Sequence, residues 1–228
     1  MRTILITCFL LMGLPAFLSA QRLEHRVSLK AGFTMPIGDF ASTSNDPNAG
    51  FAQFGFNAGV EYDLLPGWEH FAWSSGFYYI TNDYESDVFN RGVDMLLLES
   101  GSYGSYALLT GAKWHYPLSD NFHLYAVGQA GYVYTNGPYF NGVPQADPEG
   151  PLFEFEMGSS SSTAFSVGIG FLANQRTVFA LRYFYLGTHS FSKEVEYTVE
   201  SDPRRGVVAW EQPMSIITFH VGYSIQID

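Results

Sequence analysis

Ile217-Thr-Phe-His-Val-Gly-Tyr-Ser-Ile-Gln-Ile227 alternates apolar residues with polar or small ones over its whole length. Alternation of this kind predicts a β-strand, because successive side chains of a strand point to opposite faces. One face carries large aromatic and β-branched residues, whereas the other carries His220, Gly222 and small polar residues. The stretch therefore predicts a strand with one fully apolar surface.

Seven earlier segments repeat this period of two, so we expect eight strands in all. They lie at about 26–37, 53–64, 71–82, 105–117, 122–135, 163–173 and 177–187, with the eighth from 216 to the end. The segment 122–135 is compatible with two assignments of its faces, because either Tyr132 or Val133 could lie on the apolar face. We place on that face Leu124, Ala126, Ala130, Tyr132 and Tyr134.

The connections between these strands alternate in length. Three are short and turn-like, at 65–70, 118–121 and 174–176, and they interleave with four long ones at 38–52, 83–104, 136–162 and 188–215. This asymmetry is typical of transmembrane barrels, which have short periplasmic turns and long extracellular loops. We therefore expect an all-β fold: an eight-stranded antiparallel up-and-down transmembrane β-barrel with both termini in the periplasm.

The first twenty residues have the three parts of a secretory signal. A charge at Arg2 precedes an apolar run at 4–17, and the small residues Ser19 and Ala20 end it. We expect residues 1–20 to be a cleaved signal peptide and residues 21–228 to form one barrel domain. The only cysteine, Cys8, lies in the signal, so disulfides are not expected in the exported chain.

Composition favours a membrane over water. Charged residues make up only 14% of the chain, against about 25% in ordinary soluble domains, while aromatic residues reach 17%. The formal net charge of −11 disfavours a nucleic-acid partner. Strands of about eleven residues, tilted by about 40°, cover roughly 28 Å, close to the hydrocarbon thickness of a bilayer.

A secreted lipocalin-like barrel would show the same periodicity with its apolar face inward. The less apolar faces of these strands are rich in Gly, Ser and Thr, which suits a crowded lumen better than a wall in water. Aromatic residues also fall near both expected interfaces, as membrane girdles do. The lower set is Tyr62, Phe71, Trp73, Trp114 and Tyr116, and the upper set is Phe54, Tyr79, Tyr132, Tyr134 and Tyr185.

Three stretches, 30–39, 108–134 and 220–227, resemble the small outer-membrane barrel family typified by OmpX, the OmpA transmembrane domain and PorT-like proteins. The resemblance covers nearly the whole exported chain. It implies the outer membrane of a Gram-negative bacterium, with outer-membrane lipid and the barrel-assembly machinery as partners. The ending resembles the signal that this machinery reads, with His220 and Gly222 in place, Ile225 and Ile227 at its two aromatic positions, and Asp228 as last residue.

Charged residues of both signs fall on the expected inward face. A narrow eight-stranded interior is just wide enough to be filled by such side chains. We therefore expect an ion-pair plug, with a path for small solutes or protons as the alternative. The predicted lumen network consists of Lys30, Glu61, Asp63, Lys113, His115, Arg182 and His220.

The last long connection contains a second alternating pattern. Val195, Tyr197 and Val199 alternate with glutamates, a turn follows at 202–206, and 207–210 ends at Trp210. We expect a hairpin that extends the last two strands beyond the membrane, whose exposed edge could capture a protein partner. A loop that merely covers the barrel mouth is the alternative.

Sites for chemistry are not evident in the sequence. The nearest catalytic pairing, His189-Ser190, would point to opposite faces of a strand, and we expect no catalytic residues, metal site or cofactor. The leading hypothesis is a non-enzymatic surface barrel that supports the envelope or binds a protein through its loops, alone or as an accessory subunit of a larger complex. The alternatives are a narrow channel and a lipid-modifying enzyme.

Overall fold

The computed structural model describes residues 23–44, 48–67, 70–85, 95–144, 153–199 and 202–227. Most of this chain is extended, because its alternating pattern suits strands almost throughout. Within the described residues, no helix is long and apolar enough to cross a membrane. The elements are β1 (Glu24–Ile37), η1 (Gly38–Ala41), β2 (Ala52–Leu65), β3 (Phe71–Tyr84), β4 (Met95–Ser100), β5 (Tyr103–Ser119), β6 (Phe122–Asn136), β7 (Tyr139–Pro144), β8 (Phe153–Glu156), β9 (Ser159–Ala173), β10 (Thr177–Val199) and β11 (Asp202–Ile227).

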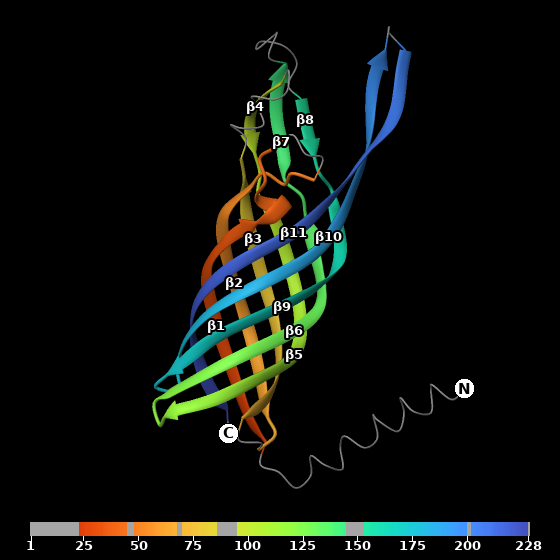
Figure 1. The fold of residues 1–228 in the computed structure, drawn as a ribbon. Helices are drawn as coiled ribbons and strands as arrows, with labels where there is room; N and C mark the ends of the chain where they lie inside the picture. The colour runs from red at the N-terminus through yellow and green to blue at the C-terminus, as the bar shows by residue number, and fades with distance from the viewer. Residues whose placement is uncertain are drawn as a thin grey trace, which may run out of the picture.

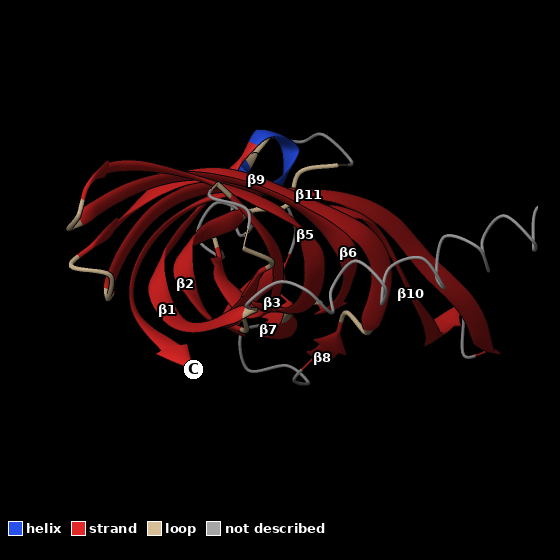
Figure 2. Cartoon of the chain, turned by 90° about the horizontal axis from the view of Figure 1, so that it is seen from below, coloured by secondary structure: helices blue, strands red, loops and turns tan. Residues whose placement is uncertain are grey.

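Eight of the strands close into one antiparallel barrel in the order β1-β11-β10-β9-β6-β5-β3-β2 (Figure 1). The first and last strands complete the ring, pairing from His25 with Ile227 to Ile37 with Ser215. The view along the barrel shows the strands curling around a central space (Figure 2). The predicted eight-stranded antiparallel barrel is confirmed.

The two ends of the barrel differ as the connection lengths predict. All three short turns lie at one end, here called the turn end, together with the C-terminus of β11 (Figure 1). The opposite end, called the loop end, carries the long connections. The expected signal at residues 1–20 and the final Asp228 lie outside the described residues.

Two of the long connections are more ordered than the sequence suggested. We expected 83–104 and 136–162 to be loops, yet they contribute β4, β7 and β8 to a separate three-stranded sheet in the order β4-β7-β8. The strands of this sheet are only four to six residues long, and of the three only β8 shows a clear alternation in the sequence, Phe-Glu-Phe-Glu. β10 and β11, with 23 and 26 residues, continue past the barrel as the predicted hairpin extension of the last two strands.

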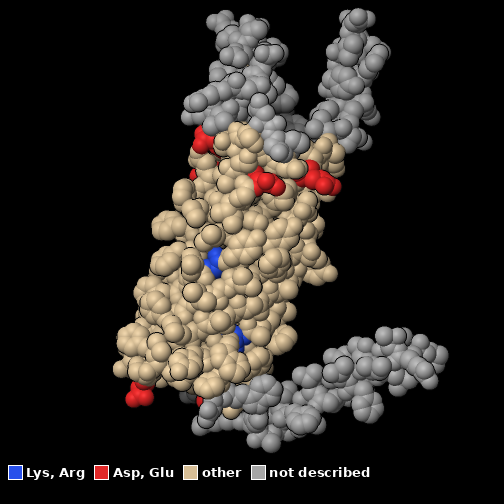
Figure 3. Space-filling view, in the orientation of Figure 1, with Lys and Arg blue, Asp and Glu red and all other residues tan. Residues whose placement is uncertain are grey.

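The apolar faces of the barrel strands point outward, as predicted. In β6 the exposed side chains include Leu124, Tyr132 and Tyr134, whereas Val133 is buried, so the chosen register is confirmed. Phe33, Phe54 and Tyr132 are each about 70% exposed, which only a lipid environment makes favourable over so wide a belt. On the face shown in Figure 3 the wall is almost without charge, and acidic side chains gather near the loop end.

The interior is more apolar than the sequence suggested. We expected a lumen of small and polar residues, but the loop-end half is filled by a cluster that includes Tyr78, Ile80, Leu109, Phe184 and Ile216. A smaller cluster at the turn end consists of Tyr125, Val127, Leu172, Val178 and Ala180. The period of two did not reveal these buried apolar positions, because the same parts of the strands carry large residues on the outward face as well.

Candidate functional sites in the lumen and at the loop end

A buried ion network lies between the two apolar clusters and centres on Glu61 of β2. The Nζ of Lys30 lies 2.5 Å from Glu61 Oε1, and Lys113 and Arg182 also form ion pairs with this carboxylate. All four residues are almost completely buried. One carboxylate therefore forms ion pairs with three cations that reach it from three other strands.

Asp63 and two neutral side chains extend the network. Lys113 Nζ donates to both carboxylate oxygens of Asp63, at 2.8 and 2.6 Å. Arg182 Nη1 donates to the hydroxyl of Tyr78 at 2.5 Å and to Gln129 Oε1 at 3.1 Å. The Tyr78 hydroxyl donates in turn to Glu61 Oε2 at 2.7 Å.

Sequence reasoning missed Tyr78 and Gln129, although a signal was available. Both stand at inward positions, Tyr78 between the outward Phe77 and Tyr79, and Gln129 one residue before the outward Ala130. Gln129 also donates from Nε2 to the Ser74 carbonyl at 3.3 Å and to the Ser74 hydroxyl at 3.1 Å. Its amide thereby joins the ion network to the wall of β3.

The two predicted histidines lie inside the barrel but beside the network. His220 shares a hydrogen bond of 2.8 Å with Asn57 Oδ1. His115 stands against the ring of Tyr125, with 6.0 Å between ring centroids, and its Nε2 has no hydrogen-bond partner among the described atoms. The structure thus places all seven predicted residues in the lumen and joins five of them directly.

The lumen is closed above the network by the chain itself. The short helix η1 carries Phe40 into the loop-end mouth, where its ring meets Tyr103 edge-on at 5.0 Å. The Tyr103 hydroxyl donates to the Gly50 carbonyl at 3.0 Å, which anchors Gly50 just before β2. At the turn end, the hollow beside Lys30, His115 and Tyr125 measures about 10 Å³, room for about one water molecule.

Beyond the barrel, β10 and β11 continue as a two-stranded ribbon. We use "ribbon" for residues 187–199 of β10 and 202–214 of β11, paired from Gly187 with Met214 to Val199 with Asp202. β10 pairs with β9 only as far as Tyr185, and β11 pairs with β1 only from Ser215. The base of the ribbon lies against the barrel, where His189, Phe191 and Met214 are buried. Farther out, along 193–199 and 202–208, no third strand of the described chain pairs with it.

The sequence-predicted hairpin residues all lie in this ribbon. Val195 pairs with Gly206, Tyr197 with Arg204, and Val199 with Asp202, so the predicted hairpin is present. The side chains of Val195, Tyr197 and Val199 lie outside the described part of the structure. At the base, the rings of Phe191 and Trp210 stack across the two strands at 5.6 Å. In Figure 1 the ribbon stands apart from the β4-β7-β8 sheet.

The residues of the predicted assembly signal have visible structural roles. His220 binds Asn57 inside, while Ile225 and Ile227 are exposed on the outer face. A Cβ on Gly222 would clash with the Leu29 carbonyl oxygen, so β1 leaves no room there for a side chain. Reading of this ending by an assembly machinery stays a prediction.

His189 and Ser190 do not form a catalytic pair. His189 is fully buried and Ser190 is exposed, so the two point to opposite faces, as expected for neighbours in a strand. His189 instead hydrogen-bonds Thr135 and the Leu186 carbonyl, at 3.2 and 3.0 Å. Within the described residues, no three His, Cys, Asp or Glu side chains could hold a metal ion together.

The sequence family is decided by a match over residues 4–224, which spans almost the whole chain. The matching profile describes the outer membrane protein beta-barrel domain. The chain belongs to this family. The turn end of this outer-membrane β-barrel is therefore periplasmic and its loop end extracellular. The comparison with curated proteins finds no match.

Solved structures share this family fold at low sequence identity. A major outer membrane protein from Thermus thermophilus is similar at 15% identity, with 90% of this chain and 99% of that chain covered and a TM-score of 0.52. Ail, the attachment invasion locus protein of Yersinia pestis, is similar at 13% identity, covering 89% and 99%, with a TM-score of 0.46. Neisserial surface protein A is similar at 10%, covering 88% and 96%, with a TM-score of 0.46. The likeness to the Thermus thermophilus protein, at 15% identity, shows the fold alone.

Proposed function

We propose that this outer-membrane barrel is a non-enzymatic surface protein that binds a protein partner through its extracellular ribbon. The observation that carries the proposal is the outer part of the ribbon, 193–199 paired with 202–208, beside which the described chain has no third strand. At about 3.3 Å per residue this outer part is about 23 Å long. An edge of this length offers a row of backbone donors and acceptors to an incoming strand.

The filled lumen supports binding over transport. Phe40 covers the extracellular mouth, the cluster around Leu109 and Phe184 fills the space beneath it, and the Glu61 network follows. A solute would have to displace both an apolar layer and a set of buried ion pairs. Purified protein in planar bilayers is expected to show no stable open events, and stable openings would support the narrow-channel alternative instead.

The chemistry of the ribbon indicates how a partner would be selected. Backbone hydrogen bonds of an added strand give affinity, whereas alternate side chains give specificity. Along 192–199 the sequence places Val195, Tyr197 and Val199 at alternate positions, with Ser192, Glu194, Glu196 and Thr198 between them. We therefore infer a partner strand that pairs with the backbone and packs apolar residues on the face of Val195 and Val199.

The test is purification of the full-length protein from its own cells in a mild detergent. A stoichiometric partner should accompany the unmodified protein and be lost when residues 193–208 are replaced by a two-residue Asn-Gly turn. The double variant Val195→Lys, Val199→Lys should also lose it. Ser192→Lys, Thr198→Lys adds the same charge at the intervening positions and should retain it.

Two results would count against the proposal. A partner that persists after removal of 193–208 would bind elsewhere on the barrel, and absence of any stoichiometric partner from the unmodified protein would favour a standalone envelope role. Adhesion of intact cells with and without the ribbon gives a second readout. We also propose export with cleavage after Ala20, so that sequencing of the purified protein should begin at Gln21.

A further inference from the structure

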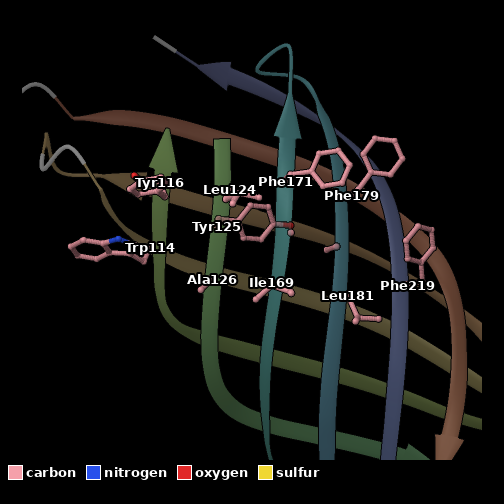
Figure 4. A pocket seen from close by; sticks show the side chains of 12 residues that line it. Trp114, Tyr116, Leu124, Tyr125, Ala126, Ile169, Phe171, Phe179, Leu181 and Phe219 are labelled. Atoms are coloured by element: carbon pink, nitrogen blue, oxygen red, sulfur yellow. The ribbon is translucent and has the colours of Figure 1, made fainter. Parts of the chain in front are cut away.

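The outer wall of the barrel has a recess on its lipid-facing side, near the periplasmic end. It has a volume of about 460 Å³ and crosses five neighbouring strands, from β5 to β11 (Figure 4). With strands about 4.8 Å apart, it extends about 19 Å around the wall. We call it the outer groove, and its outward-facing lining consists of Trp114, Tyr116, Leu124, Ala126, Ile169, Phe171, Leu181 and Phe219, which are exposed, and the half-buried Phe179.

Strand register explains why a recess forms here. Two outward rows cross the sheet, one through Leu124, Phe171 and Phe179, and the other through Ala126 and Ile169. Ala126 is the small member of the second row and leaves a gap between its large neighbours. The stacked rings of Phe171 and Phe179, 4.8 Å apart, form one wall of that gap.

Little side-chain volume lies in the barrel wall directly behind the groove. The inward row between the two outward ones contains Gly170, which pairs with Tyr125 and with Ala180. The Tyr125 ring lies flat behind Gly170, since a Cβ there would come within 2.5 Å of its Cζ. Small residues therefore form the bottom of the groove, and the Tyr125 ring separates the groove from the polar lumen.

The lining determines what can occupy the groove. Almost all of its surface is apolar, so water would find few hydrogen-bond partners there. The groove opens into the hydrocarbon of the membrane. The molecules available to fill it there are lipids, whose acyl chains are flexible and apolar. Its elongated shape and its size, within the range of ordinary ligand sites, fit one such chain rather than a compact molecule.

An exposed cation lies close in sequence to the groove residues, in a turn at the periplasmic end of the barrel. Arg176 is exposed in the turn that joins β9 to β10, three residues before Phe179. Arginine presents a planar fork of donors that matches phosphate. Because this turn is at the periplasmic end, the phosphate it meets belongs to the periplasmic leaflet.

We propose that the outer groove binds one glycerophospholipid of the periplasmic leaflet, with an acyl chain between Ala126 and Phe171 and its phosphate at Arg176. This site lies on the barrel wall, away from the ribbon, and does not depend on partner binding there. The bound lipid fills a defect in the barrel surface that freely exchanging lipids would fill less completely.

The proposal is tested by counting lipids on the full-length barrel. The protein is extracted in mild detergent, supplied with phosphatidylethanolamine and phosphatidylglycerol, and weighed intact by native mass spectrometry. One retained phospholipid per barrel is expected for the unmodified protein. Ala126→Phe fills the groove and should abolish retention, whereas Ala130→Phe, on the outer face of the same strand but outside the groove, should retain the lipid.

The headgroup contact is tested by Arg176→Gln. An exposed charge contact is worth up to about 1 kcal/mol, so retention should fall by up to about fivefold while the barrel stays folded. Heat-dependent gel mobility checks folding of every variant. Equal retention by Ala126→Phe and Ala130→Phe would overturn the site, and a mass of two chains that Ala126→Phe abolishes would show a second copy of the protein in the groove instead.

Discussion

β10 and β11 run through two regions of the molecule with opposite properties. From Thr177 to Tyr185 β10 is paired on both sides, and Arg182 in its middle is fully buried among hydrogen-bond partners. From Gly187 onward the same strand is paired on one side only. The change occurs at a bulge between Tyr185 and Gly187, where Gly187 has a φ of +86°.

Gly187 marks the boundary because no other residue fits there. Its φ lies in the left-handed region that glycine adopts without steric cost. A Cβ would also lie 2.5 Å from the Thr163 carbonyl oxygen of β9. The difference between the two regions teaches that one pair of strands can serve two purposes: the closed part holds the barrel together, and the open part remains available to another chain.

The largest expected effect concerns the closed part, at Glu61. Glu61→Gln removes the carboxylate that forms ion pairs with Lys30, Lys113 and Arg182, all of them buried. Leaving buried charge uncompensated costs about 3–5 kcal/mol, so the free energy of unfolding should fall by that amount. Urea unfolding of the barrel in lipid vesicles, followed by tryptophan fluorescence, measures the loss.

Glu24→Gln provides the matched control for this substitution. Glu24 is exposed at the start of β1 and accepts a long hydrogen bond of 3.3 Å from Gln226. Its removal should change the free energy of unfolding by less than about 0.5 kcal/mol. If Glu61→Gln were no more destabilising than Glu24→Gln, the network would contribute little to the stability of the barrel.

The next effect comes from the close contact of strands in the wall. A Cβ on Gly32 of β1 would meet the Phe219 carbonyl of β11, whereas a Cβ on Gly128 of β6 would meet nothing within 4 Å. Gly32→Ala should therefore cost about 1–3 kcal/mol in the same unfolding experiment, and Gly128→Ala should be close to neutral. Equal effects would mean that β1 and β11 can separate to make room.

The barrel could be predicted almost entirely from the sequence. Alternation is a local property, so Phe219, Val221 and Tyr223 reveal their strand and its outward face without knowledge of any partner. Short turns such as 174–176 then fix which strands are neighbours. The same logic located all seven lumen residues, because inward positions follow once outward ones are assigned.

The remaining features depend on long-range packing, which a local pattern does not contain. Nothing near Phe40 in the sequence indicates that its ring covers the mouth against Tyr103, 63 positions away. The small sheet of β4, β7 and β8 joins segments from two different connections. The outer groove likewise arises where Ala126 and Gly170 meet across strands, although each is an ordinary member of its own segment.

A smaller effect is expected at the base of the ribbon. The stacked rings of Phe191 and Trp210 join its two strands, and an aromatic pair contributes about 0.5–1.5 kcal/mol beyond its buried area. Trp210→Ala should speed hydrogen exchange of the ribbon amides about two- to tenfold and leave exchange in the barrel unchanged. Faster exchange throughout β10, including residues 177–185, would show that ribbon and barrel open together.

The smallest expected effect is the sharpest test of the comparison. Replacing residues 193–208 by Asn-Gly removes most of the ribbon but keeps the Phe191–Trp210 stack and every pair between β10 and β9. The free energy of unfolding should change by less than about 0.5 kcal/mol, because the ribbon adds few contacts to the closed barrel. Urea unfolding measures this directly.

A near-zero change in the free energy of unfolding would separate the effect of the ribbon on stability from its effect on partner binding. Partner capture should disappear in the shortened protein while the unfolding midpoint stays in place, so that loss of binding cannot be ascribed to a damaged barrel. A shortened protein that unfolds at clearly lower urea would show instead that the ribbon supports the wall through Gly187 and the bulge. The two regions of β10 and β11 would then form a single cooperative unit.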